Sequence, residues 1–426
     1  MQASADPILF LGDVHLGRRP TSLSGPLQDL GLSPQKLSPA ATLSLTVDHA
    51  LRVGARALVF AGDVVEALQD RFEAYAVLER EVKRLADAGV PVYGVAGNHD
   101  GVALPRLAAR LDGFHLLGEG GTWEQVAIPG DGPPVALAGW SFPQEHHRAN
   151  PLDAPGARDA LRRPAQGALL GVLHGDLDAS GSPYAPVRSA DLARTEADAW
   201  FLGHIHRPHP LHERPFGYLG SLCGLDIGEP GARGPWEVRV HGREVVATQV
   251  PLAPIRWEHL HLDVSECADA DAVHTQLVQT LRGLPDHDPT LLDRRLQVVV
   301  VRVFLVGRRQ HGQVAAELIA TTQTPMELTS ALAGKPVILE SLHDLTRPAV
   351  DLPRLATQPT PAGRLAALIQ RIEAEGADAE VLAQLRAEAD RWPNPEPLPG
   401  ETLRAIASQA AWKALDTLLQ TRTEAR

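Results

Sequence analysis

The chain has 426 residues, of which 44% are hydrophobic and 22% are charged, as in an ordinary globular protein. The formal net charge of −12 argues against general electrostatic affinity for nucleic acid, although a local basic groove remains compatible with it. Aromatic residues make up only 4%, so an extended platform of interleaved aromatic side chains for base stacking is not expected. A chain of this length predicts two or three domains.

The two cysteines, Cys223 and Cys267, are far apart and outside any CxxC spacing, which predicts neither a disulfide framework nor a zinc–thiolate site and indicates a reducing compartment. The first residues lack the basic segment and long apolar stretch of a signal peptide. The longest apolar run, 296–306, is interrupted by Arg302 and is too short to span a bilayer. We therefore expect a cytoplasmic protein with no membrane-spanning segment.

Strand-like and helical patterns alternate through roughly the first 110 residues, which predicts a layered α/β domain. A helix is expected from Ser38, the N-cap, and Pro39, a favoured first residue. A second helix is expected over 70–88, because its apolar residues have helical spacing. The pattern over 114–140 is typical of strands, with a Gly/Pro break at 129–134.

The loop over 18–39 is rich in Ser, Pro, Leu and Gly and directly follows the first polar motif of the chain. Loops in that position flank the crevice at the end of a sheet. Two interpretations are open: the loop shapes substrate access, or it is a solvated connection without a role.

The pattern changes near 251–254, after which three strand-like segments and one helix indicate a small α+β domain. A Pro/Thr-rich stretch that follows is typical of a linker. Two helical segments, 363–391 and 401–421, come last, and the second has an apolar face. We predict the segment boundaries 1–252, 253–345, 346–362 and 363–426.

Five short motifs contain residue types that bind metal ions, and each follows an apolar run that is typical of a buried strand. They are Asp13-Val14-His15, Gly62-Asp63, Gly97-Asn98-His99-Asp100, His174-Gly175 and Gly203-His204-Ile205-His206. Side chains at strand ends of an open α/β sheet converge on one crevice. One such motif is weak evidence, but all five at strand ends predict a two-metal site.

The chemistry of a two-metal hydrolase assigns a role to each of these residues. Asp63 is the natural bridge, because one carboxylate can hold two cations about 3.5–4 Å apart. Asn98 offers a neutral carbonyl, which limits the negative charge that would repel a phosphate. His99, next to a ligand, is the candidate general acid. We expect the first metal to be held by Asp13, His15 and His206, and the second by His174 and His204.

Other polar residues are better explained without a functional role. Isolated histidines are more often surface or hydrogen-bonded residues than ligands, and this applies to His115, His146, His147, His209 and His212. Asp176 and Asp178, which follow His174, are expected to be turn or cap residues.

Through the motifs DVHLG, GNHD and GHIH, residues 7–250 closely resemble the calcineurin-like metallophosphoesterase superfamily. With the stretch YLGSLCGLDIGEPGARGPW they resemble its SbcD-type DNA repair exonuclease branch. The resemblance implies a four-layer α/β/β/α sandwich with a small α+β capping domain and C-terminal helices. It also implies two Mn²⁺ ions and a metal-bridging hydroxide that attacks the phosphodiester, while His99 protonates the leaving oxygen. The implied activities are 3′–5′ exonuclease and single-strand endonuclease, in the nuclease subunit of a DNA repair complex.

Glu66 departs from the family pattern, which commonly has Asp or His at this position. Glu66 either orients His99 for catalysis or faces the substrate as an acid. Arg18, Arg19 and Arg207 adjoin the first and last motifs and are expected at the crevice rim, where arginine forks match the phosphates of DNA. The pairs Arg162-Arg163 and Arg308-Arg309 are better explained as solvated residues.

The resemblance also implies a partner, an SbcC-like coiled-coil ATPase that would bind the C-terminal helices; packing of these helices on their own domain is equally open. A homodimer is common in the branch. Two other functions compete: a small-molecule phosphodiesterase or phosphatase of the same superfamily, and a scaffold with a purely structural metal site. The C-terminal segments argue against the first, and the presence of His99 argues against the second.

Overall fold

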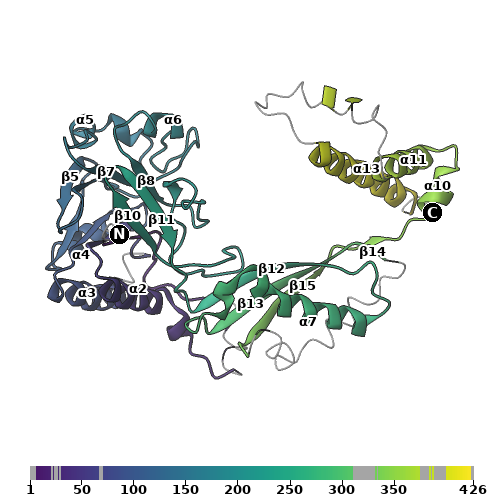
Figure 1. The fold of residues 1–426 in the computed structure, drawn as a ribbon, viewed down its shortest axis with the longest axis horizontal. Coiled ribbons are helices and arrows are strands. Elements are labelled where there is room, and N and C mark those ends of the chain that lie inside the picture. Colours follow the sequence, from purple (N-terminus) through teal and green to yellow (C-terminus); the bar gives the residue numbers. More distant parts are fainter. Residues whose placement is uncertain are drawn as a thin grey trace. The chain divides into compact units, whose positions relative to one another are not determined.

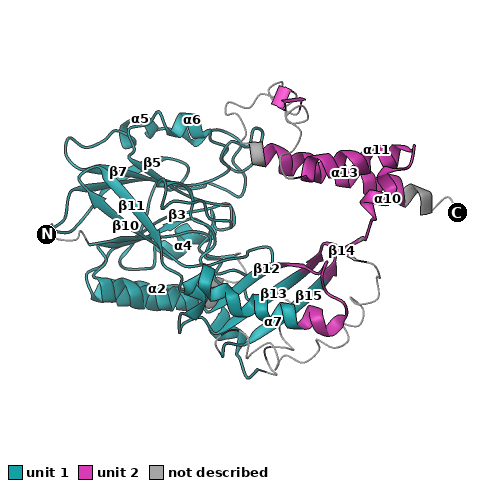
Figure 2. Cartoon of the chain, turned by 45° about the vertical axis from the view of Figure 1, so that its right-hand side comes forward, with its two compact units in different colours: residues 1–260, 275–303, 321–342 teal, residues 261–274, 304–320, 343–426 magenta. Residues whose placement is uncertain are grey.

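The computed structural model divides into two compact units, coloured separately in Figure 2, and each is described by itself. Unit 1 contains residues 1–260, 275–303 and 321–342, and unit 2 contains 261–274, 304–320 and 343–426. The predicted domain boundaries stay a prediction. The structure describes residues 6–20, 23, 27, 30–66, 71–309, 332, 334–374, 383–384, 386–387 and 400–423.

Unit 1 contains a six-stranded sheet in the order β11-β10-β1-β2-β3-β4. Figure 1 labels its β10–β11 hairpin. Strands β1 to β4 are parallel, and the β10–β11 hairpin is joined antiparallel to β1. The strands are β1 (Ile8–Leu11), β2 (Ala57–Ala61), β3 (Val92–Val95), β4 (Phe114–Leu116), β10 (Trp236–His241) and β11 (Glu244–Gln249).

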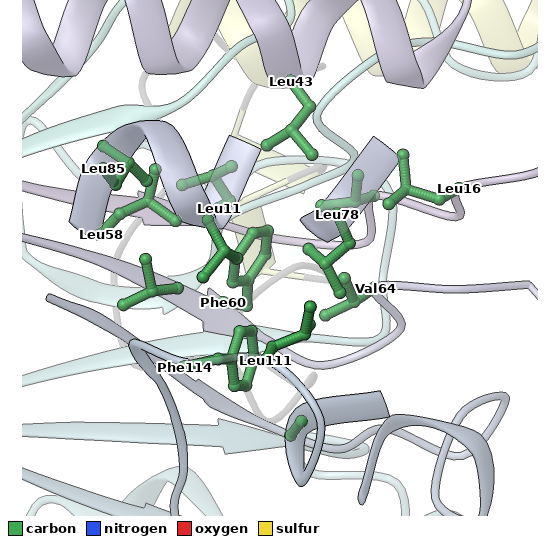
Figure 3. Packing of buried hydrophobic residues seen from close by; sticks show 14 of the residues in the cluster. Leu11, Leu16, Leu43, Leu58, Phe60, Val64, Leu78, Leu85, Leu111 and Phe114 are labelled. Atoms are coloured by element: carbon green, nitrogen blue, oxygen red, sulfur yellow. The ribbon is translucent and has the colours of Figure 1, made fainter. Parts of the chain in front are cut away.

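Helices α2 (Pro39–Val53), α3 (Arg71–Asp87) and α4 (Ala103–Ala108) cover one face of this sheet. Helix α2 begins as expected, with the Ser38 side chain accepting a hydrogen bond from the Ala41 N–H, and a short 3-10 turn, η1 (Pro34–Leu37), precedes it. Figure 3 shows the packing beneath, where Leu43 and Leu78 belong to the same cluster as Phe60. Burying such a side chain stabilises the fold by about 1.5–3 kcal/mol.

A second, five-stranded sheet has the order β5-β6-β7-β8-β9, parallel except for β5. Its strands are β5 (Trp123–Ile128), β6 (Val135–Trp140), β7 (Ala168–His174), β8 (Ala199–Gly203) and β9 (Phe216–Tyr218). The two sheets face each other across one apolar cluster, in which the rings of Phe10 and Phe201 are 4.2 Å apart.

The outer face of the second sheet packs against short elements in a cluster built around Trp123, Trp140 and Trp200. These elements include η2 (Pro151–Asp153), α5 (Ala157–Ala160) and α6 (Ser189–Leu192). The order helices, sheet, sheet, helices confirms the predicted four-layer α/β/β/α sandwich.

A three-stranded sheet has the order β12-β13-β15, from β12 (Ile255–Asp263), β13 (Val298–Val306) and β15 (Val337–Asp344). It accompanies α7 (Ala270–His287) and the turn η3 (Pro289–Leu292), so the predicted α+β composition is observed. Within unit 1, Leu27 and Leu37 of the loop over 18–39 are buried in one cluster with Trp257 of β12 and Cys223. This loop is therefore anchored at its leucines and is not a purely solvated connection.

The C-terminal helices, in unit 2, are α10 (Leu352–Ala356), α11 (Pro361–Glu373) and α13 (Gly400–Thr423). Ile369 and Ile372 of α11 pack with Leu415 of α13, so the two helices cover each other's apolar faces. Arg308 lies in the short β14 (Arg308–Arg309), which pairs with β16 (Arg347–Pro348). The Arg308 guanidinium lies 3.7 Å from the Trp412 ring centroid.

The predicted helix over 363–391 is present as α11 up to Glu373, and most of its remainder lies outside the described residues. Among the residues that the structure describes, no helix is both long enough and apolar enough to cross a bilayer.

Candidate metal centre

The five motifs lie at or just after the carboxyl ends of β1, β2, β3, β7 and β8, which are parallel strands of the two facing sheets. Asp63 lies between the two sets of predicted ligands: its Oδ2 is 3.8 Å from His15 Nε2 and 3.4 Å from His174 Nε2. The structure thus brings the residues after β2 and β7 together, although they are more than 100 positions apart.

The backbone at these strand ends is unusual. Asp13, His15, Asp63 and His204 have φ values of 40°, 49°, 48° and 106°, a region that non-glycine residues rarely adopt. Close approach also explains the motif glycines. A Cβ on Gly97 would collide with the Asp63 carboxylate, and a Cβ on Gly62 would collide with the His174 ring.

The first predicted site is built from two histidines that are oriented by carboxylates. His15 donates from Nδ1 to Glu66 Oε2 at 2.6 Å, and His206 donates from Nδ1 to Glu229 Oε1 at 2.8 Å. These hydrogen bonds leave the Nε2 lone pairs directed inward, the arrangement of metal-binding histidines. Asp13 Oδ2 is buried there without a hydrogen-bond partner. A buried acceptor without a partner is costly, and a cation would satisfy it.

The second predicted site converges on Asn98. His174 donates from Nδ1 to the Ala61 carbonyl at 3.0 Å, and its Nε2 lies 3.0 Å from Asn98 Oδ1. His204 Nδ1 lies 3.1 Å from the same oxygen. The His204 backbone N–H donates to Asp13 Oδ1 at 2.9 Å, which joins the two sites.

The charges in this cluster shift its pKa values in opposite directions. Burial by itself would raise the pKa of Asp63, but the neighbouring His174 and His15 lower it, so the carboxylate is ionised. Burial by itself would lower the pKa of His174, but the charges of Asp63 and Asp13 raise this pKa to about 9. Burial and the adjacent His174 lower the pKa of His204. The cluster therefore has an ionised bridge between imidazole groups.

His99 lies at the mouth of the cluster. Its side chain is 42% exposed, and its backbone N–H donates to Asp63 Oδ1 at 3.0 Å. Its Nδ1 is 3.8 Å from Glu66 Oε1. Glu66 therefore contacts His15 directly and lies beside His99, and the bond to His15 lowers its pKa.

The three arginines predicted at the rim have different surroundings. Arg18 Nε lies 3.9 Å from Glu66 Oε2, and Arg18 and Arg19 line a pocket of about 110 Å³ with Gln35 and Ser38. Arg207 is exposed directly after His206. Of the other predicted arginines, Arg163 is paired with Asp198 and Arg308 with Asp416.

The histidines predicted to have no functional role lie outside the ligand cluster. His115 pairs with Glu124 and His212 with Glu213, while His209 packs on the Tyr218 ring. His147 packs on the ring of Trp140, and His146 stacks on Tyr184.

Three acids outside the predicted set of metal ligands support the site. Asp100 accepts hydrogen bonds from the Val64 and Gly97 N–H groups, and burial together with the Asp63 charge raises its pKa to about 7. Glu229 accepts from the Ser221 hydroxyl as well as from His206. The third, Asp176, lies beside His204. Asp100 belongs to the GNHD motif, but no spacing in the sequence indicates which side chains Glu229 and Asp176 contact.

The donor set fits divalent cations. Among the described residues, Asp13, His15 and His206 could hold one ion, and Asp13, Asp63 and His174 could share another. The candidate ligand atoms of a third group, His15, Glu66 and His99, also lie within 4.8 Å of one another. Carboxylate, amide carbonyl and imidazole ligands suit Mn²⁺ and similar ions.

Comparison with known proteins agrees with this chemistry. Residues 6–208 match the family described as calcineurin-like phosphoesterase. The chain is 26% identical over 269 residues to an uncharacterized metallophosphoesterase, YhaO, of Bacillus subtilis, with 58% of this chain and 61% of the relative covered. It is 25% identical over 439 aligned positions to the DNA double-strand break repair protein Mre11 of Aeropyrum pernix. This match covers 96% of this chain and 98% of the relative.

A shorter match, 32% identical over 97 residues, is to the Mre11 protein of Sulfurisphaera tokodaii and covers 23% of each chain. Among solved structures, the protein TT1561 of Thermus thermophilus is similar, with 14% identity and a TM-score of 0.34 over 58% of this chain and 99% of that one.

Proposed function

Because residues 6–208 are a calcineurin-like phosphoesterase domain, we propose that the chain is a two-metal phosphodiesterase acting on DNA. The proposed activities are 3′–5′ exonuclease and single-strand endonuclease, within the nuclease subunit of a DNA repair complex. One observation carries the phosphodiesterase assignment: candidate ligand atoms converge on two adjacent points with a carboxylate, Asp63, between them. The match to an Mre11 protein along 98% of that relative's length favours DNA as substrate.

In this proposal Asp13, His15 and His206 hold one ion, Asn98, His174 and His204 hold the other, and Asp63 bridges them. Bound divalent cations, with Mn²⁺ as the preferred ion, would activate water and neutralise phosphate charge. The chain's own residues supply the rest. His99, exposed at the mouth, donates a proton to the leaving oxygen. Glu66 holds His15 through Nδ1 and stabilises a charged His99 from 3.8 Å.

DNA backbone phosphates would lie against Arg18, Arg19 and Arg207, because their guanidinium groups are the cations next to the metal motifs. We propose a cytoplasmic protein that assembles with an SbcC-like coiled-coil ATPase and forms a homodimer. Because α11 and α13 bury their apolar faces against each other, a partner would bind the outer faces of this helical pair.

The test compares two substrates in the presence of Mn²⁺. The proposal expects release of nucleotides from linear DNA. Hydrolysis of bis-p-nitrophenyl phosphate with no cleavage of any DNA would instead support the alternative, a small-molecule phosphodiesterase or phosphatase. Hydrolysis of neither, with both ions bound, would support a structural metal site in a scaffold.

A further inference from the structure

His204 is oriented differently from the other histidines of the cluster. Its Nδ1 faces Asn98 Oδ1 at 3.1 Å, whereas His174 presents Nε2 to the same oxygen. A neutral imidazole carries one hydrogen, so Nδ1 is an acceptor only when that hydrogen is on Nε2. For His204 Nδ1 to bind a metal ion beside that oxygen, the hydrogen must be on Nε2, and a group near Nε2 must favour it there.

Asp176 is in the position to do this. Its Oδ1 lies 3.3 Å from His204 Nε2, with the two side chains 17% and 16% exposed. An ionised carboxylate accepts hydrogen bonds and does not donate them. A hydrogen on Nε2 is therefore favoured by Asp176, and the Nδ1 lone pair is left directed at the second predicted metal position.

Asp176 is itself held from several directions. Its Oδ2 accepts the Ser182 hydroxyl, and its backbone N–H donates to the Tyr184 carbonyl at 2.8 Å. Tyr218 holds the residues on either side: its hydroxyl accepts from the Leu177 N–H at 2.6 Å and donates to the Gly175 carbonyl at 3.2 Å. Such bracing is more than a turn or cap residue requires, which was the role expected for Asp176.

We propose that Asp176, braced by Ser182 and Tyr218, is a positioning residue that selects the Nδ1-binding tautomer of His204 and so sets the affinity of the second metal position. This inference rests on the metal site of the proposed function and adds to it the group behind His204. Outer carboxylates of this kind typically change metal affinity by about 10–100-fold when removed.

The experiment measures Mn²⁺ binding by equilibrium titration, without DNA. Asp176→Ala is expected to lower affinity at one of the two positions by about 10–100-fold and to leave the other unchanged. Asp176→Asn should lose less, because its side-chain carbonyl still faces Nε2. The matched control is Asp178→Asn on the same loop. The Asp178 side chain accepts a hydrogen bond from the Ser189 N–H and contacts no histidine among the residues that the structure describes. This variant should bind Mn²⁺ as the wild type does.

A spectroscopic readout separates positioning from general loss of structure. Electron paramagnetic resonance of the protein with two equivalents of Mn²⁺ should show coupled ions in the wild type. Asp176→Ala should show one bound and one free ion, with coupling restored by excess Mn²⁺. Ser182→Ala, which removes only the hydroxyl donor, should show a smaller loss at the same position and serves if Asp176→Ala does not fold.

Wild-type affinity at both positions in folded Asp176→Ala, or in Ser182→Ala if that variant alone folds, overturns the inference. The proposed function can fail separately: two Mn²⁺ ions bound with this dependence on Asp176, but no DNA cleavage, would support the inference and reject DNA as the substrate. A wild-type chain that binds no Mn²⁺ would overturn both.

Discussion

The Nε2 atoms of His15 and His206 lie 3.1 Å apart, although each ring already donates its Nδ1 hydrogen to a carboxylate. Neutral rings in this orientation direct two lone pairs at each other. The pair is stable only with positive charge between the nitrogens, and the unpartnered Asp13 Oδ2 belongs to the same group of candidate ligands. A shared proton also supplies such a charge, but the unpartnered Asp13 Oδ2 beside the two rings favours a metal cation.

Metal removal should destabilise the fold. Because the acceptors of this cluster repel one another without cations, we expect Mn²⁺ to raise the melting temperature and a chelator to lower it, as measured by calorimetry. At a free Mn²⁺ concentration 100 times Kd, each occupied site adds about 2.7 kcal/mol of stability. The variant Asp63→Asn should no longer bind two ions. The control variant Asp131→Asn, at an exposed position between β5 and β6, should still bind two. An unchanged melting temperature at saturating Mn²⁺ would contradict the cation site.

Replacing the proton donor should separate catalysis from binding. His99→Ala removes a side chain that is 42% exposed at the mouth of the cluster. We expect DNA cleavage to fall by about 10²–10⁴-fold, the usual contribution of a general acid, with Mn²⁺ stoichiometry unchanged. His115→Ala is the control, because that histidine is exposed and pairs with Glu124. Equal cleavage rates for the His99 and His115 variants would remove His99 from the reaction.

The carboxylate behind His206 should matter for the first metal position. Glu229→Gln weakens the acceptor that orients His206, so Mn²⁺ affinity at one position should fall by about 10–100-fold. Glu244→Gln, on the exposed start of β11, should have no effect. Titration with Mn²⁺ checks both variants, and identical isotherms would mean that Glu229 serves only to stabilise the loop.

The loop that follows the first motif should contribute to stability through its leucines. Leu27 is 1% exposed within the cluster that contains Trp257, so Leu27→Ala should cost about 2–5 kcal/mol. Leu292→Ala, at a leucine that is 49% exposed, should cost about 0.5 kcal/mol or less. Urea unfolding measures both, and equal midpoints would show that the loop is not anchored.

Much of the fold could be predicted because local signals agreed with tertiary packing. Each apolar run before a motif is a strand, and Ser38 caps α2 as its sequence indicates. The final helix, expected over 401–421, extends over Gly400–Thr423. Strands and helices of this kind are determined by periodicity and caps, which are visible within a few neighbouring residues.

The contacts behind the predicted ligands could not be predicted. Glu229 reaches His206 across 23 positions, and Asp176 reaches His204 from a different strand end. Nothing in their sequence neighbourhoods distinguishes them from turn residues, because their role depends on which loops meet in space. Glu66 shows the same limit: its departure from the family pattern is visible in the sequence, but its bond to His15, 51 positions away, depends on the fold.

The left-handed backbone at Asp13, His15, Asp63 and His204 has a consequence for laboratory evolution. Sparsely populated backbone conformations cost of the order of 1–3 kcal/mol each, and glycine relieves that cost. Laboratory selection for thermal stability alone should therefore enrich glycine at these four positions. The selected proteins should be more stable but should lack predicted metal ligands and therefore the proposed activity.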